Sequence, residues 1–506
     1  MQPDAYITID NFYTATIYEK GSEVIGMLKT LVGDEGYRKA TDLYFERHDG
    51  QAATVEDWVK CFEDANGRDL AQFRLWYAQS GTPTIEAKGE YDAAKKTYAL
   101  TLTQSLGPTP GQPTKKPMHM PVRLGFVGAN GALPLTLEGE NAKGPEERVL
   151  ELTKAEERFV FVDVAEEPLL SVGRGFSAPA VFKVPTDRKA HAVLMGRDAD
   201  AFNRWEAGQA LATDLLKEMA QSPQPKPDPV YVSAIGEVLA RAEEDIAFAA
   251  QMLVPPLESE IALAMTPPDP DAINAARTAL IRAIANAHGA RIETLYRKLE
   301  TRSAYAPDAA SAGRRALRNV LLRYLTARDD EAAAALADAH YRAATNMTDM
   351  IAGLAALTRM NSERRHAAFA HFHDRFRADP LVLDKWMSLQ AGSPLPDTVN
   401  GVRALMKHPA FDMKNPNRVR ALVGAFCGNH LRFHAADGAG YALVGETIRT
   451  LDSINPQVAS RIAGAFEAWH RYDPARQALM RAELEAALKL PGISANLFEV
   501  ASKMLG

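Results

Sequence analysis

The sequence predicts a multidomain α+β protein, in which a helical N-terminal segment, a small β-sandwich and a large all-α C-terminal domain of packed helix pairs follow one another. Three successive patterns of apolar residues predict this order. Apolar residues recur at helical spacing over residues 1–83, alternate with a period of two over residues 84–182, and return to helical spacing over residues 183–506. A chain of 506 residues is also too long for one ordinary hydrophobic core.

The first segment, residues 1–83, is predicted to consist of helices. Its first helix has apolar residues at helical spacing: Ile17, Val24, Ile25, Leu28, Leu31 and Val32. Asp10 or Asn11 can cap the start of this helix, and Gly33 stands where a left-handed residue would end it. A second helix is predicted to open at Thr54, with Asp57 three residues later as a variant of the capping box.

The second segment, residues 84–182, follows a turn at Ser80–Pro83 and is predicted to be a β-sandwich. Tyr98, Leu100 and Leu102 alternate with threonine and alanine, and Phe159–Val162 is rich in strand-forming residues. The proline-rich stretch Gly107–Pro117 is predicted to be a surface connection between two strands.

The third segment, residues 183–506, is rich in alanine, leucine and arginine and carries one amphipathic helical pattern after another. Prolines interrupt the pattern at Pro223–Pro227 and at Pro267–Pro268. No strict repeat period occurs, so we expect an array of packed helix pairs without a repeat written into the sequence.

The amino-acid composition limits the classes of binding partner and the cellular compartment that we expect for this protein. The 58 Lys and Arg residues against 64 Asp and Glu give a net charge of −6 without long runs of one sign, so neither a nucleic-acid nor an anionic-membrane partner is expected. Cys61 and Cys427 lie far apart in sequence, which argues against a disulfide framework and for a reducing, cytoplasmic location. No long apolar run and no signal-peptide pattern occur, so a soluble protein is expected.

Histidine spacing indicates no metal site. A hydrolytic zinc site needs three ligands, usually two histidines one helical turn apart and a carboxylate, with a glutamate nearby as general base. Of the 12 histidines only His430 and His434 have this spacing, and Leu431 occupies the position of the general base, so surface or packing histidines are favoured. A second group is predicted to lie on a solvated, arginine-rich helix face: His366, His371 and His373.

Two tyrosines near the start stand out. Tyr13 and Tyr18 lie in a stretch where Glu19 and Lys20 add a carboxylate and an ammonium group to the same early helical turn. From the residue pattern alone, packing at the edge of a core is the favoured interpretation, because aromatic spacing on a helix usually reflects packing.

The stretch Tyr18–Gly21 resembles the part of the catalytic domain that follows the zinc-binding helices in the zinc aminopeptidases of the aminopeptidase N family, which have the gluzincin fold. Further runs resemble this family in the right order along the whole chain: Tyr44–Gly50, Trp76–Pro83, Asn346–Asp349, Asp384–Trp386, Asn415–Arg420, Asp437–Tyr441 and Asn455–Arg461. The bacterial cytoplasmic branch is the most similar.

The resemblance implies a four-domain enzyme. Residues 1–83 would be the helical end of a thermolysin-like catalytic domain, residues 84–182 a β-sandwich domain, and residues 183–506 the α-helical C-terminal domain. By the same resemblance Tyr18 donates its hydroxyl to the oxyanion formed in peptide-bond hydrolysis, and a phenol can do so as a preorganised hydrogen-bond donor. Tyr13 would line the substrate pocket. Arg420 would face an internal cavity and meet a peptide's C-terminal carboxylate, with a structural ion pair between helices as the alternative.

Zinc is implied for the complete enzyme, but its ligands are absent from this chain: neither His-Glu-x-x-His nor Gly-x-Met-Glu-Asn occurs. We therefore expect a C-terminal fragment of a zinc metallo-aminopeptidase of peptide catabolism, inactive alone, whose partners are a peptide substrate and the missing N-terminal catalytic half. A truncation and a split enzyme both fit this expectation. The alternative is a non-catalytic scaffold that binds peptides or proteins. The inner face of the first helix lacks a covering segment, which predicts self-association.

Overall fold

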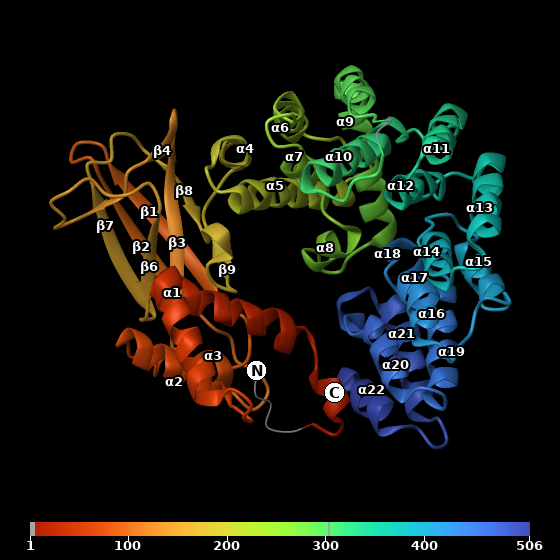
Figure 1. The fold of residues 1–506 in the computed structure, drawn as a ribbon, viewed down its shortest axis with the longest axis horizontal. Coiled ribbons are helices and arrows are strands. Elements are labelled where there is room, and N and C mark those ends of the chain that lie inside the picture. The colour runs from red at the N-terminus through yellow and green to blue at the C-terminus, as the bar shows by residue number, and fades with distance from the viewer. Residues whose placement is uncertain (1–5, 302–303) are drawn as a thin grey trace. The chain divides into compact units, whose positions relative to one another are not determined.

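The computed structural model describes residues 6–301 and 304–506, and the chain folds as two compact units (Figure 1). Among the described residues, unit 1 comprises Tyr6 and Phe12–Gly208, and unit 2 comprises Ile7–Asn11 and Gln209–Gly506. The boundary at residue 208 lies inside helix α5 (Ala201–Gln221), which therefore begins in unit 1 and ends in unit 2.

The first long helix of unit 1 is α1 (Ala15–His48). Its N-cap residue is Thr14, and no side chain caps the helix start, so the prediction that Asp10 or Asn11 caps α1 is wrong. Both belong instead to the preceding 3-10 turn η1 (Ile9–Phe12). Gly33 has a φ of 73° and interrupts the helical geometry, but the chain returns to a helix at once. The helical stretch that begins at Ala15 therefore ends at Gly33, as predicted, and a second helical stretch of α1 follows across a kink.

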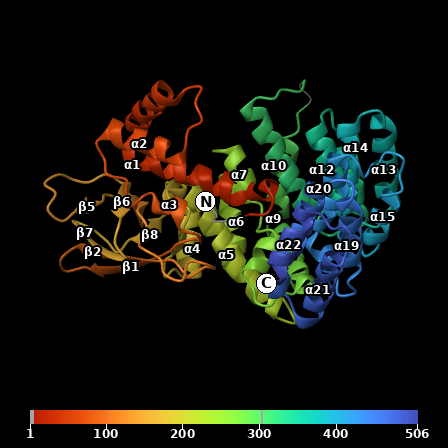
Figure 2. The same cartoon turned by 90° about the horizontal axis from the view of Figure 1, so that it is seen from below.

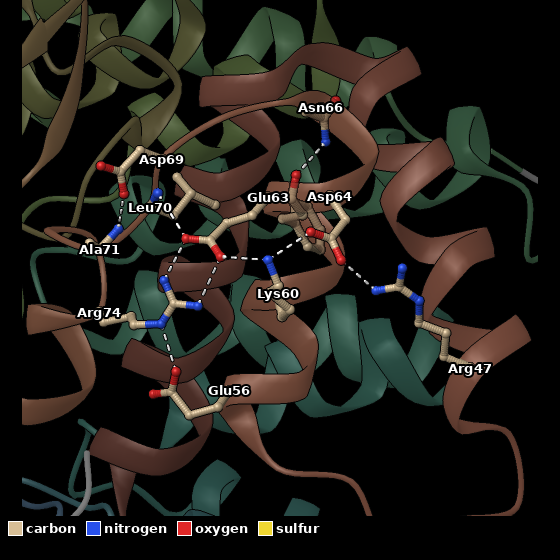
Figure 3. A network of polar contacts seen from close by, with 11 residues as sticks. Arg47, Glu56, Lys60, Glu63, Asp64, Asn66, Asp69, Leu70, Ala71 and Arg74 are labelled. Atoms are coloured by element: carbon tan, nitrogen blue, oxygen red, sulfur yellow. Dashed lines mark hydrogen bonds and ion pairs between the residues drawn. The ribbon is translucent and has the colours of Figure 1, made fainter.

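Helix α2 (Val55–Asn66) packs against α1 and is followed by the short helix α3 (Leu75–Ala78). Its predicted capping box is confirmed, because the Asp57 amide donates to the Thr54 hydroxyl and the Thr54 amide donates to the Asp57 carboxylate. Charged side chains join the three helices (Figure 3). Arg74 forms ion pairs of 2.7 and 2.6 Å with Glu63 and Glu56, and the Asp64 carboxylate bridges to α1 through the Arg47 guanidinium at 2.7 Å.

The strands of unit 1 form two sheets, as the predicted β-sandwich requires. The first sheet has the strand order β5-β7-β2-β1-β9, and in the second β3 pairs antiparallel with β4, β6 and β8. Their bounds are β1 (Thr84–Asp92), β2 (Thr97–Ser105), β3 (Met120–Gly128), β4 (Gly131–Leu133), β5 (Thr136–Leu137), β6 (Arg148–Leu152), β7 (Glu156–Val162), β8 (Leu169–Val172) and β9 (Val181–Lys183). Tyr98, Leu100 and Leu102 are buried, as their alternation predicts. The stretch Gly107–Pro117 connects β2 and β3.

One hydrophobic core joins the helices α1–α3 to the sandwich. It contains Leu28 from α1 and Phe62 from α2 together with strand residues such as Leu100 and Phe126. Unit 1 is completed by the turn η2 (Arg174–Phe176), by α4 (Arg188–Arg197) and by the start of α5. A buried ion pair of 2.7 Å between Arg174 and Asp198, the residue that follows α4, holds this helix to the sandwich.

Unit 2 is helical, as predicted. Its helices are α6 (Pro229–Ala240), α7 (Ile246–Met252), α8 (Glu258–Leu263), α9 (Pro270–Lys298), α10 (Ala309–Leu325), α11 (Glu331–Ala343), α12 (Met347–Leu357), α13 (Glu363–Phe376), α14 (Pro380–Ala391), α15 (Thr398–Leu405), α16 (Pro416–Val419), η3 (Arg420–Gly424), α17 (Ala425–Cys427), α18 (His430–Phe433), α19 (Ala439–Asp452), α20 (Pro456–Ala463), η4 (Gly464–Phe466), η5 (Trp469–Arg471), α21 (Pro474–Leu488) and α22 (Ala495–Leu505). Six of them begin with proline directly after a capping Asp or Asn side chain. Proline suits this position because the backbone N–H of the first helical residue has no hydrogen-bond partner within the helix, so its absence costs nothing.

Helices close in sequence pack as pairs in unit 2, for example α9 with α10, α11 with α12 and α19 with α20. Figure 1 shows them following one another along an arc from α9 through α13 to α22, and Figure 2 again shows α22 beside α20. Both cysteines are free thiols, Cys61 in unit 1 and Cys427 in unit 2. Within residues 6–301 and 304–506, no helix has the length and apolar character needed to cross a membrane.

Candidate functional site

Tyr13 and Tyr18 lie side by side at the start of α1. Their ring centroids are 6.3 Å apart, and their side chains are 46% and 64% exposed in the structure. The packing interpretation, which placed both rings at the edge of a core, is therefore wrong. A phenol hydroxyl that no protein group occupies is a free hydrogen-bond donor. Glu19 is exposed beside Tyr18, whereas Lys20 points back into unit 1.

Lys20 anchors the helical turn that carries Tyr18. Its Nζ donates a hydrogen bond of 2.8 Å to the carbonyl oxygen of Gly81 and lies 5.6 Å from the centre of the Trp76 ring. Partial burial, together with the nearby ammonium of Lys115, lowers the pKa of Lys20. The cation is thus held by a carbonyl and an aromatic face, which fixes the first turns of α1 against the Trp76–Pro83 segment.

The Trp76–Pro83 segment is itself rigidly held. The buried Trp76 indole donates to the His119 carbonyl at 2.9 Å, and Gln79 exchanges two hydrogen bonds with the backbone of Lys116. Gly81 has a φ of 98°, and a Cβ there would come within 2.9 Å of the Leu106 side chain. Only glycine fits this position without strain. The sandwich thus supplies the support on which the Tyr18 turn rests.

The inner face of α1 is partly covered, contrary to the expectation of an uncovered helix. Val24, Leu28 and Leu31 are buried in the core of unit 1, while Ile25 is 37% exposed. Tyr13, Tyr18 and Ile25 are among the apolar residues that are exposed around the start of α1. Self-association through them stays a prediction.

The residues just before Tyr13 are fixed to the last helix of the chain. The backbone amides of Ile7 and Thr8 donate to the two carboxylate oxygens of Glu499 at 2.9 and 3.1 Å, and the side-chain amide of Asn11 donates to Glu499 at 3.0 Å. A fourth donor, Lys503 Nζ, lies 2.8 Å away. The Glu499 side chain is 1% exposed. Glu499 is not among the residues that the sequence singles out, because nothing in its neighbourhood on α22 distinguishes it from other helical glutamates.

Arg420 lies in unit 2, so the structure does not place it on the same unit as the two tyrosines. It begins a π-helical turn, η3, inside the continuous helix from α16 to α17, and such turns often accompany functional sites. Its guanidinium is exposed and donates to the Asn417 side chain at 3.2 Å. Among the described residues it forms no ion pair, so its alternative role as a structural ion pair does not apply.

His430 and His434 pack inside unit 2. The Tyr472 hydroxyl lies 3.1 Å from His430 Nε2 and 2.9 Å from His434 Nε2, while His434 Nδ1 meets the Tyr441 hydroxyl at 2.9 Å. Burial lowers the pKa of both imidazoles, that of His434 to about 2. The packing interpretation therefore accounts for this pair. Of the second group, His366 and His371 are exposed as predicted, whereas His373 is partly buried and contacts Trp386 with the two ring planes tilted by 47°.

The described residues do not fit a zinc centre. Across residues 6–301 and 304–506, no group of three or more His, Cys, Asp or Glu side chains is arranged to hold a metal ion. What unit 1 offers is therefore an exposed phenol on a helical turn that is anchored by Lys20 and Gly81.

Family comparisons match the chain from end to end. Residues 1–77 match the peptidase family M1 domain, residues 81–185 match a domain of unknown function with an Ig-like fold (DUF3458), and residues 188–506 match a domain of unknown function with ARM repeats (DUF3458_C). The last description agrees with paired helices, although the sequence itself shows no strict repeat period.

Similar proteins are named aminopeptidase N. The chain is 43% identical to aminopeptidase N of Caulobacter vibrioides, 39% to that of Escherichia coli and 36% to that of Haemophilus influenzae, in each case over 100% of this chain and 58% of the relative. The chain thus spans little more than half the length of these relatives.

A solved structure, Legionella pneumophila aminopeptidase A in complex with aspartic acid, matches all of this chain with a TM-score of 0.89 and 27% identity, and the match covers 58% of that chain. The three family matches together with these full-chain similarities show that the chain belongs to the aminopeptidase N family of metallopeptidases, as the counterpart of a C-terminal part of its members.

Proposed function

We propose that this chain is part of a zinc-dependent aminopeptidase that removes N-terminal residues from peptides, and that Tyr18 is its catalytic contribution. The observation that carries the proposal is the exposed Tyr18 hydroxyl on an anchored turn, within a segment that matches the peptidase family M1 domain. A preorganised donor aimed at the oxyanion of peptide hydrolysis stabilises the transition state more than the substrate. The zinc ion, held by residues outside this chain, would supply the activated water.

The other parts of the chain have supporting roles in this proposal. Residues 1–83 are the C-terminal portion of the catalytic domain, residues 84–182 the β-sandwich domain, and residues 183–506 the helical C-terminal domain. Tyr13, whose ring lies beside Tyr18, lines the substrate pocket. Arg420, exposed and without an ion pair among the described residues, binds the C-terminal carboxylate of the peptide. We further propose a cytoplasmic location, supported by two free thiols in different units.

The test is reconstitution of the whole enzyme. The chain is joined to the N-terminal part of the Caulobacter vibrioides relative, loaded with zinc and assayed on an alanyl chromogenic amide. Tyr18→Phe removes only the hydroxyl, so we expect kcat to fall by about 10²–10³-fold while KM changes little. Tyr305→Phe, at an exposed tyrosine of unit 2, is the matched control and should leave kcat unchanged.

Full kcat in the Tyr18→Phe enzyme would refute the catalytic role of Tyr18. A reconstituted protein that binds peptides without cleaving them, and whose affinity for them is the same with and without zinc, would instead support the non-catalytic scaffold.

A further inference from the structure

A cavity in unit 2 carries an excess of positive charge. It has a volume of about 530 Å³ and is lined by residues from α8, α9, α10, α12 and α18. Its charged lining residues are Arg277 on α9, Arg323 on α10, Arg359 just after α12, and Glu258 on α8. Three guanidinium groups thus face one carboxylate. We call this site the arginine cavity.

The carboxylate of Glu258 does not neutralise the arginines directly. It accepts a hydrogen bond of 2.7 Å from the Asn274 side chain, and none of the three guanidinium groups forms an ion pair with it. Arg277 is 7% exposed and donates to the backbone carbonyls of Pro255 and Pro256. Arg359 pairs with Asp329 at a distance of 3.5 Å, which is long for an ion pair.

The Arg323 guanidinium has no direct partner. Among the described residues it forms neither a hydrogen bond nor an ion pair, although it borders the cavity, and Glu258 acts on it only through space. Burial and the neighbouring cations Arg277 and Arg359 lower the pKa of Arg323 to about 10. Holding like charges together away from water is unfavourable unless an opposite charge joins them. A structural role for Arg323 would need a fixed acceptor, and the described residues supply none.

The cavity lining also contains buried polar atoms without partners. His430 is 8% exposed, and its Nε2 is engaged with Tyr472 while its Nδ1 has no hydrogen-bond partner among the described residues. The Oδ1 of Asn319, on the same helix as Arg323, is likewise unpartnered. Buried polar groups are nearly always satisfied, and a missing ligand is one reason for exceptions.

We propose that the arginine cavity is a binding site for a small oxyanion, a free phosphate or a dicarboxylate, with Arg323 as its principal contact. The planar fork of a guanidinium donates two parallel hydrogen bonds to a carboxylate or phosphate group. The volume of about 530 Å³ leaves ample room for such a ligand and is within the range of small-molecule pockets. The site lies within unit 2 and does not depend on Tyr18 or on peptide cleavage.

The test uses the full chain and two probes, inorganic phosphate and succinate, titrated calorimetrically and by thermal shift against sodium chloride of equal ionic strength. We expect saturable binding of at least one probe and a rise of Tm with its concentration, because a ligand that binds only the folded state stabilises it. The probe that binds identifies the chemistry. Tyr18→Phe should bind it with unchanged affinity.

Arg323→Gln should weaken the affinity by about tenfold or more, since a charged hydrogen-bonding partner is lost. Arg481→Gln is the matched control, because Arg481 is exposed and pairs with Glu485 on the surface of α21. It should change the affinity less than about twofold. If Arg323→Gln does not fold, Arg323→Lys takes its place. It keeps the positive charge but loses the planar guanidinium that donates two parallel hydrogen bonds, so we expect several-fold weaker binding.

The proposal is overturned if neither probe stabilises the chain more than chloride does. It is equally overturned if Arg323→Gln and Arg481→Gln weaken binding to the same extent.

Discussion

Glu499 offers the sharpest test of how the segment before Tyr13 is held. Burial raises the pKa of this carboxyl, but the hydrogen bonds from Ile7, Lys503, Asn11 and Thr8 outweigh that effect and lower its pKa to about 2, from an ordinary value near 4.5. At 1.36 kcal/mol per pKa unit, the charged form of Glu499 gains about 3 kcal/mol from these contacts. The share from Ile7, Thr8 and Asn11 holds the segment, whereas the share from Lys503 lies within α22. Because the side chain is 1% exposed, water screens these contacts little.

The perturbation is Glu499→Gln, which keeps the shape but removes the charge and turns one acceptor atom into a donor. That donor would face the Ile7 or Thr8 amide, so both the attraction and one hydrogen bond are lost. We expect the docking of the Ile7–Asn11 segment onto α22 to weaken by about 2–3 kcal/mol. The measurement is native-state hydrogen exchange, in which the Ile7 and Thr8 amides should exchange roughly a hundredfold faster.

The pH dependence gives a second readout. The pKa of Glu499 is lowered in the folded chain, so its contribution is fully present above about pH 5 and is lost as the pH falls toward 2. Glu485→Gln is the control, since that carboxylate forms an exposed pair with Arg481. Unchanged exchange at Ile7 and Thr8 in Glu499→Gln, or an equal acceleration in Glu485→Gln, would refute the reasoning.

Further outcomes are expected elsewhere in the chain. Asp198→Ala leaves the Arg174 guanidinium charged and buried, so the free energy of unfolding of unit 1, measured in urea, should fall by about 3–5 kcal/mol. A loss under about 1 kcal/mol would show that the fold does not depend on this ion pair. Gly81→Ala strains a residue with a φ of 98° and crowds Leu106, so a destabilisation of about 1–3 kcal/mol is expected in the same assay. Its effect on kcat in the reconstituted enzyme should match that of Lys20→Met, because both release the turn that carries the proposed catalytic group. The isolated chain supplied with zinc should not hydrolyse an alanyl chromogenic amide, and robust turnover would contradict our assignment of the metal ligands to residues outside it.

Local sequence decides local structure in several places. The Thr54 and Asp57 side chains cap α2 because both hydrogen bonds of the capping box join residues three positions apart. Alternation from Tyr98 to Leu102 predicts which side chains face the sandwich core, since a strand turns successive side chains to opposite faces. The order of helical, sandwich and helical segments follows from such periods, and the family resemblance follows from short runs of neighbouring residues.

Contacts between residues far apart in sequence decide the features that short stretches of sequence do not predict. Asn11 has the side chain of an N-cap, yet its amide donates to Glu499, which lies 488 residues away, and a sequence read in short windows cannot anticipate this choice. Packing also overrules pattern at Tyr13 and Tyr18, whose helical spacing suggests a core that the structure does not form around them. The arginine cavity shows the same limit, because Arg277, Arg323 and Arg359 belong to different helical segments and look like ordinary helix-surface cations in the sequence.

By itself, then, the sequence determined the secondary-structure periods, the fold class and the family, because all three depend on residues that are neighbours along the chain. Only the tertiary structure decided that Lys20 and Gly81 hold the Tyr18 turn, that Glu499 holds the segment before it, and that three arginines share one cavity. The physical reason is that electrostatic interactions and the cost of burying polar groups depend on distances in space. Folding sets these distances, and spacing along the sequence does not.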